Sequence, residues 1–206
     1  MRRRAGARPS APRGARGPPA DARANVLALE LSEAAGKAAL QGHAEEASQL
    51  FAKAHQGTTN LKVLRLAYEF YRARGDYSAA MDLADRMVAV AGRNAATSDA
   101  AAALESAGQI SMRLGKLKQA LGQFDRSLRI CKAIGNREIE ASCYTGIAGI
   151  RRLQGDLERA EDMQRQSLAI QKMMPNERAL AIGFSHLGVI LHARGVLRRV
   201  VAAMLV

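Results

Sequence analysis

The residues that most often carry catalysis or bind metals are sparse in this sequence. The candidates for acid–base chemistry or for a metal site are four histidines, His43, His55, His186 and His192. His186 and His192 are six positions apart, which places them on different faces of one helix. His43 directly follows a turn glycine, where we expect it to be solvated. We therefore predict no catalytic residues, no metal site and no cofactor.

Two cysteines and two glycine-containing turns are the other candidates for chemistry. Cys131 and Cys143 are too few for a disulfide framework or a metal set. Both lie in segments of apolar periodicity, where a free cysteine usually packs as a small core residue. The stretches GNREIE (135–140) and GDLERA (155–160) lack the Gly-Lys-Ser/Thr ending that a phosphate-binding loop requires. We predict that the chain is not an enzyme.

The composition favours an all-α protein. Of the 206 residues 48% are apolar and 24% are charged, but only 4% are aromatic. Alanine and leucine, which are strong helix formers, dominate the apolar set, and runs of β-branched residues are scarce. No apolar stretch approaches the roughly 18 residues that a transmembrane helix needs. We expect a soluble, cytoplasmic protein without a membrane partner.

The net charge of +12 is concentrated at the N-terminus. Residues 1–25 hold seven arginines and one aspartate, together with four of the five prolines. This composition predicts a disordered tail, because it offers almost no large apolar residues for a core. Such a tail could be an unstructured leader, a contact for nucleic acid or an acidic surface, or an import segment. Nucleic-acid binding is the weakest of these interpretations, since no aromatic stacking positions accompany the arginines.

A regular repeat fills the rest of the chain. The segment RLGKLKQALGQFDRSLRICKAIGN (113–136) recurs in altered form forty residues later. Glycines that precede a short polar turn stand at intervals of 33, 40, 40 and 40 residues, at Gly42, Gly75, Gly115, Gly155 and Gly195. Such regularity is typical of units that are too small to bury their own apolar face and therefore stack on one another.

Each unit reads as two helices joined by a tight turn. Small residues at matching depths, such as Gly108 and Ala120, allow two antiparallel helices to approach closely. Gly75-Asp76 and Gly155-Asp156 pair a glycine that can end one helix with an aspartate that can cap the next. The first helices are predicted at 28–41, 61–74, 98–114, 137–154 and 177–194, and their partners at 43–56, 77–91, 117–133, 157–173 and 197–206.

With this spacing the chain resembles the tetratricopeptide repeat family. The match is best in the third unit, through Leu104, Ala107, Gly108, Gly115, Leu117, Ala120, Phe124, Ser127 and Leu128, and in the fourth, through Tyr144, Ile147, Ala148, Gly155, Leu157, Ala160, Ser167 and Leu168. The resemblance implies an all-α fold, a right-handed α-solenoid of stacked antiparallel helix hairpins. It covers residues 28–206, in units of about 28–60, 61–97, 98–136, 137–176 and an incomplete 177–206.

Two features depart from the family pattern. The period of 40 residues exceeds the usual length of about 34 and resembles the longer-helix variety of bacterial regulators and signalling scaffolds. In the last unit Val200 replaces a small residue, and no polar capping helix follows. This end is predicted to be altered or cut after Gly195, and to promote self-association through its apolar side.

The resemblance also implies a ligand groove, which the first helices of the units line. The family's ligand positions fall on Lys62, Arg65, Glu69, Arg72, Glu105, Gln109, Met112, Arg113, Ser142, Thr145, Gly149 and Arg152. The predicted partner-binding residues are Lys62, Arg65, Glu69, Arg72, Gln109, Arg113 and Arg152, whose basic balance predicts an acidic protein or peptide ligand. The family's carboxylate clamp is absent, because Ser32, Gly36, Ala102 and Ser106 stand at its positions. The competing interpretation is a solvated face with internal ion pairs, for instance Arg65 with Glu69.

These features predict a non-enzymatic protein–protein interaction module that binds a peptide or helix of a partner in its concave groove. The alternative is a regulatory or sensor arm, a fragment of a larger bacterial signalling or transcription protein. The alternative rests on the resemblance of the long period alone.

Overall fold

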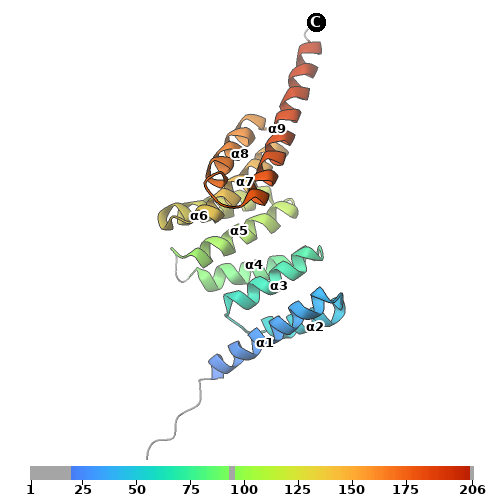
Figure 1. The fold of residues 1–206 in the computed structure, drawn as a ribbon, viewed down its shortest axis with the longest axis vertical. Coiled ribbons are helices and arrows are strands. Elements are labelled where there is room, and N and C mark those ends of the chain that lie inside the picture. Colours follow the sequence, from blue (N-terminus) through green and yellow to red (C-terminus); the bar gives the residue numbers. More distant parts are fainter. Residues whose placement is uncertain (1–19, 93–95, 205–206) are drawn as a thin grey trace, which may run out of the picture.

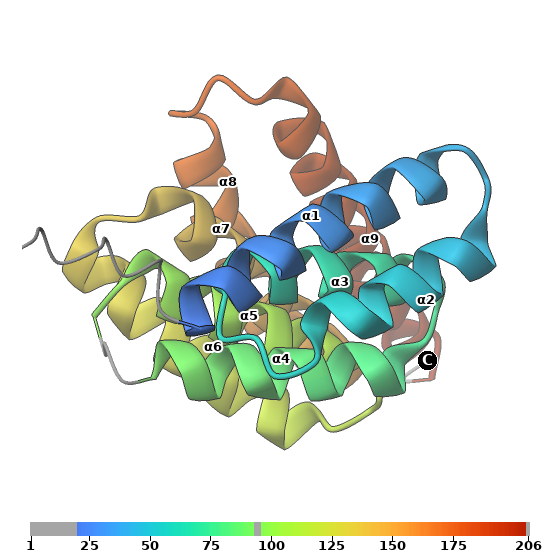
Figure 2. The same ribbon diagram turned by 90° about the horizontal axis from the view of Figure 1, so that it is seen from below.

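The computed structural model of the protein describes residues 20–92 and 96–204. Within these ranges the chain is all-α, as predicted, and forms nine helices: α1 (Ala20–Leu40), α2 (Ala44–His55), α3 (Leu61–Ala73), α4 (Tyr77–Ala91), α5 (Ser98–Arg113), α6 (Leu117–Ile134), α7 (Arg137–Leu153), α8 (Leu157–Gln171) and α9 (Glu177–Met204). The helices form a solenoid of stacked antiparallel hairpins, α1–α2 to α7–α8, and each hairpin packs on the next (Figure 1). Figure 2 shows the same stack from below, with the hairpin of α1 and α2 nearest the reader.

The turns inside the hairpins follow the predicted chemistry. Gly75 and Gly155 both adopt a left-handed φ of 79°, which favours glycine because it has no Cβ. The side chain of Asp76 then accepts a hydrogen bond from the Ala79 amide at 3.1 Å, and that of Asp156 accepts one from Arg159 at 3.3 Å. Each glycine therefore ends one helix while the following aspartate caps the next.

The close packing between hairpins is centred on Phe124 in α6. Its side chain is fully buried and lies between two glycines, Gly108 of α5 and Gly146 of α7. A Cβ placed on Gly108 would lie 2.8 Å from the ring, and one placed on Gly146 would lie 2.5 Å from it. The predicted close approach at Gly108 is therefore confirmed. The matching role of Gly146 was not predicted.

A repeated hydrogen bond joins the two helices of a hairpin. Ser127 of α6 donates to the carbonyl of Ala101 at 2.7 Å, and forty residues later Ser167 of α8 donates to the carbonyl of Ala141 at 2.8 Å. Both serines are fully buried. The bonds satisfy hydroxyl groups that would otherwise be costly to bury, and they fix the same register in both hairpins.

Two predicted boundaries differ from the structure at the N-terminal end. α1 begins at Ala20, so residues 20–25 of the predicted tail are helical, whereas residues 1–19 lie outside the described residues. The segment from Ala20 carries three alanines and follows the last proline of the tail, Pro19. Asn25 is also tied to the array, because its side chain accepts a hydrogen bond of 2.8 Å from Thr58.

The predicted fifth hairpin is wrong. α9 runs without a turn through Gly195 to Met204, so the predicted helix at 197–206 does not form a separate element. At the corresponding turns a polar residue, which tolerates the exposure of a tight turn, follows the glycine, as in Gly115-Lys116 and Gly155-Asp156, whereas the apolar Val196 follows Gly195. Gly188, predicted at a close helix crossing, is consequently exposed.

None of the helices in the described part of the chain is long and apolar enough to cross a lipid bilayer.

Candidate functional site

A groove with a volume of about 690 Å³ runs across one side of the stack. Five helices contribute to it: α3, α5, α7, α8 and α9. The lining residues are Arg72, Gln109, Met112, Arg113, Ser142, Thr145, Gly146, Gly149, Arg152, Gln164, Ile182, His186, Val189 and Ile190. The three first helices of successive hairpins thus meet at one surface, and α9 closes it on the C-terminal side.

The structure brings four of the seven predicted binding residues together in this groove: Arg72, Gln109, Arg113 and Arg152. Lys62 and Arg65 instead line a separate depression between the N-terminal parts of α3 and α5, together with Asp99. Lys62 lies 4.0 Å from the carboxylate of Glu33 in α1. The predicted site therefore divides into a main groove and a smaller basic depression.

Glu69 acts as the partner of a groove arginine. Its carboxylate accepts a hydrogen bond of 3.0 Å from Nε of Arg72, and a second one from the Nη2 atom of the same guanidinium group. The predicted pair of Arg65 with Glu69 is wrong, because Glu69 is occupied by Arg72 one turn later. Arg72 is held in place but remains partly exposed, at 35% of its side-chain surface.

The other two groove arginines differ in how they are held. The guanidinium carbon of Arg113 lies 5.8 Å from the ring centroid of Tyr77, a cation–π contact that orients the side chain. Arg152 is exposed, and its side chain makes no hydrogen bond or ion pair with any residue that the structure describes. Three guanidinium groups from three consecutive hairpins therefore line one groove, and Arg152 has its full hydrogen-bonding capacity available.

A polar network behind the groove centres on Glu105 of α5. Its carboxylate accepts hydrogen bonds from Ser142 of α7 and from the side-chain amide of Gln109. Burial of the carboxyl group is the main cause that raises the pKa of Glu105, with a smaller contribution in the same direction from Glu69. The two hydrogen bonds and Arg72 act in the opposite direction but do not outweigh burial. Glu105 thus orients two groove residues and destabilises the fold when it is ionised.

We expect Glu105→Gln to raise the melting temperature at pH 7. The raised pKa means that ionising Glu105 costs more in the folded than in the unfolded chain, and this penalty grows as the pH rises above the ordinary pKa of 4.5. The glutamine carbonyl can still accept from Ser142 and Gln109. Thermal unfolding at several pH values measures this effect. The difference in melting temperature between the variant and the parent should decrease as the pH falls toward 4. A variant that is less stable than the parent at neutral pH would contradict this account.

The wall formed by α9 is mainly apolar, and it was not predicted. Ile182 and Val189 are 47% and 50% exposed and face the groove beside His186. From α8, Gln164 donates a hydrogen bond of 3.1 Å to the carbonyl of Gly183. The sequence contained a signal for this wall, because Ile182 and Val189 stand forty residues after the groove residues Ser142 and Gly149.

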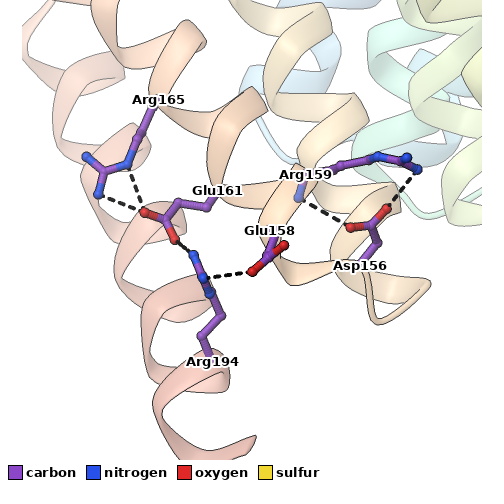
Figure 3. A network of polar contacts seen from close by, with 6 residues as sticks. All are labelled: Asp156, Glu158, Arg159, Glu161, Arg165 and Arg194. Carbon is purple, nitrogen blue, oxygen red and sulfur yellow. Dashed lines mark hydrogen bonds and ion pairs between the residues drawn. The ribbon is translucent and has the colours of Figure 1, made fainter. Parts of the chain in front are cut away.

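An ion-pair network attaches α9 to α8 (Figure 3). Arg194 of α9 reaches back to two carboxylates of α8, Glu161 and Glu158, the latter at 3.3 Å. Glu161 also binds Arg165 at 2.8 Å, and the hydrogen bonds from Arg165 and then Arg194 lower its pKa. Because Glu161 and Arg194 are largely shielded from solvent, salt screens this contact less than it screens an exposed surface pair. The network fixes the orientation of α9 and so the position of the apolar wall.

The groove combines positive charge with apolar surface. Within the described ranges, no group of three or more His, Cys, Asp or Glu side chains is placed to hold a metal ion. Cys131 and Cys143 are buried, and burial raises the pKa of both thiols, so they pack in the core as predicted. What the groove presents is positive charge on α3, α5 and α7 beside an apolar wall on α9.

Comparison with known proteins agrees with this fold. Residues 99–173 match the family model described as tetratricopeptide repeat. A search of curated protein sequences gives no match. Among solved structures, BtubC from P. vanneervenii superimposes with a TM-score of 0.71 at 19% identity and covers 90% of this chain and 84% of its own.

Two further solved structures show the same architecture. A putative kinesin light chain from Podosopora anserina, described as nearly identical TPR-like repeats, has a TM-score of 0.65 at 16% identity, covering 85% of this chain and 90% of its own. The MamA protein has a TM-score of 0.58 at 12% identity, covering 86% of this chain and 90% of its own. At these identities the likeness establishes the fold, a TPR-like solenoid.

Proposed function

We propose that this chain, a tetratricopeptide repeat protein, binds a segment of a partner protein in the groove between α3 and α9. Proteins of this family are generally non-enzymatic modules for protein–protein interaction. The observation that carries the proposal is the convergence of Arg72, Arg113 and Arg152 on one groove that also has an apolar wall. Charge and apolar surface in one groove suit a peptide or a helix better than a small metabolite.

The chemistry of the groove defines the partner segment. Three guanidinium groups favour a segment with aspartate or glutamate side chains, since arginine can bind a carboxylate through two parallel hydrogen bonds. The exposed side chains of Ile182 and Val189 favour an apolar anchor a short distance along the same segment. The proposed ligand is therefore an acidic, amphipathic peptide or helix, steered toward the groove by charge.

A charge reversal at three positions tests this function. Peptides selected from a random display library against the full chain should be enriched in acidic residues next to an apolar one. The triple variant Arg72→Glu, Arg113→Glu and Arg152→Glu should bind such a peptide about 10- to 100-fold more weakly, because each exposed contact contributes ~0–1 kcal/mol. Fluorescence anisotropy at low and moderate salt measures the loss, which should be largest at low salt.

A matched control separates the groove from the net charge. Lys118→Glu, Arg126→Glu and Arg129→Glu make the same change in net charge on exposed positions of α6, outside the groove. This control should retain most of the affinity, and both variants should keep the helical circular-dichroism spectrum. Equal losses in the two variants would reject the groove in favour of a nonspecific charge effect. Loss of binding on removal of residues 1–19 alone would assign recognition to the basic tail.

A further inference from the structure

The junction between the first hairpin (α1 and α2) and the second (α3 and α4) contains a histidine in contact with an arginine. His55 is the last residue of α2, and Arg86 lies in α4. The Nη1 atom of Arg86 is 3.1 Å from Nδ1 of His55. The Nη2 atom of the same guanidinium group donates to the backbone carbonyls of His55 at 2.7 Å and of Thr58 at 3.2 Å. The side chains of His55 and Arg86 are half-buried, and neither lines the groove.

This contact requires a neutral imidazole ring. A guanidinium group has five N–H donors and no acceptor, so Nδ1 of His55 is unprotonated and accepts the hydrogen bond from Arg86. The hydrogen of the ring is then on Nε2. When Nδ1 binds a proton, the hydrogen bond is lost and two positive groups face each other at the same place.

No negative charge is placed to offset this repulsion. The titratable or charged side chains that face His55 are Arg86 of α4 and Tyr71 of α3, whose ring centroid lies 6.3 Å from that of the imidazole in an edge contact. Neither His55 nor Arg86 forms an ion pair with a carboxylate in the part of the chain that the structure describes. Burial of the ring and then the charge of Arg86 lower the pKa of His55, and its own backbone carbonyl, which acts in the opposite direction, does not outweigh them.

The same arginine helps to attach the first hairpin to the second. Its two bonds to carbonyls fix the connection between α2 and α3, and in that connection the hydroxyl of Thr58 donates to the side chain of Asn25 in α1 at 2.8 Å. The first hairpin lies at one end of the stack (Figure 1). α1 and α2 together pack on α3 less extensively than α4 packs on α5. The attachment of this hairpin therefore depends more on a few polar contacts than that of the inner hairpins.

We propose that the contact between His55 and Arg86 is a pH-sensitive switch, which holds the first hairpin on the second in neutral solution and releases it in mildly acidic solution. The lowered pKa means that the docked hairpin binds the proton less readily than the released one. The stabilisation is therefore complete above the ordinary pKa of 6.5 and decreases as the pH falls below it. The helices from α3 onward stay stacked, because each later hairpin has its own contacts with its neighbour. The first hairpin does not line the groove, so the switch does not depend on the proposed function.

Hydrogen exchange of the full chain, followed by mass spectrometry, tests the switch. Rates are measured at about pH 7.5 and about pH 5.5, on either side of the ordinary histidine pKa, and are corrected for the intrinsic effect of pH on exchange. Amides of α1 and α2 should lose protection at the lower pH, whereas those of α7 and α8 should keep it. His55→Asn should remove this difference, because its side-chain oxygen can accept from Arg86 and does not titrate.

His43→Gln is the control. It removes the other histidine of the same hairpin, which is exposed and lies 3.6 Å from the carboxylate of Glu46 instead of against an arginine. This variant should still lose protection at the lower pH. Arg86→Met should leave α1 and α2 less protected than in the parent at neutral pH, with no further loss in acid. Equal protection of the first hairpin at both pH values in the parent, a loss that persists in His55→Asn, or a loss that extends equally to α7 and α8 would each overturn the proposal.

Discussion

Phe124→Ala is expected to lower the free energy of unfolding by about 3–5 kcal/mol, the range observed when a fully buried phenylalanine is truncated. The ring is 0% exposed and fills the space between α5 and α7. Its neighbours across that space are Gly108 and Gly146, which have no side chains that could move into the cavity. The surrounding residues therefore cannot fill the cavity that Phe124→Ala leaves. For this reason the expected decrease in the free energy of unfolding lies in the upper part of the range for core truncations.

Urea unfolding followed by circular dichroism measures this loss. Leu153→Ala is the control, because Leu153 is 57% exposed on α7 and its truncation should change stability by no more than about 0.5 kcal/mol. Phe124→Leu, which retains part of the volume, should fall between the two. A loss below about 1 kcal/mol for Phe124→Ala would mean that α5, α6 and α7 do not pack around this ring.

Gly146→Leu is expected to have the next largest effect, a destabilisation of at least about 1–3 kcal/mol from overpacking. The first atom of the new side chain would lie 2.5 Å from Phe124, well inside van der Waals contact. The ring has little room to withdraw, because Gly108 of α5 lies on its other side, where even an added Cβ would be too close to it. Either α7 moves away from α6 or the ring leaves the core, and both changes separate neighbouring hairpins of a solenoid that is stabilised by such contacts.

A second glycine on the same helix provides the control for this prediction. A Cβ on Gly149 would lie 3.6 Å from the sulfur of Met112, an ordinary contact with a flexible side chain. Gly149→Leu should therefore leave the melting temperature unchanged or raise it, since glycine is about 0.8–1.0 kcal/mol less favourable in a helix than alanine, and leucine ranks just below alanine. Similar melting temperatures for Gly146→Leu and Gly149→Leu would show that the packing around Phe124 has been assigned incorrectly.

Much of the fold could be predicted from the sequence because it depends on local chemistry. A left-handed glycine followed by a capping aspartate, as at Gly75-Asp76, ends one helix and starts the next through contacts within a few residues. The hairpin boundaries from α2 to α8 were accordingly predicted to within two residues. The same reasoning misjudged Gly195, where α9 continues without a turn and an apolar residue, Val196, follows the glycine.

The residues that line the groove were predictable only in part. The resemblance to the tetratricopeptide repeat family implied Arg72, Arg113 and Arg152 as ligand positions, and the structure places all three along one groove. The resemblance did not separate Lys62 and Arg65 from the groove, since both stand on the same helix as Arg72 and only the packing of α5 against α3 and α4 divides that surface. Glu69 was correctly placed near the groove but assigned to Arg65, because two arginines lie within its reach along α3 and the sequence does not rank them.

The sequence by itself determined the repeat, the positions of the turns and the excess of positive charge on the first helices, because each follows from residue types at fixed local spacing. The tertiary structure decided how Phe124 fits between Gly108 and Gly146, and how Arg194 attaches α9 to α8. It also decided that α9 supplies an apolar wall of the groove. These features depend on the distances and angles between helices that are far apart in the chain, which packing sets and local propensity does not.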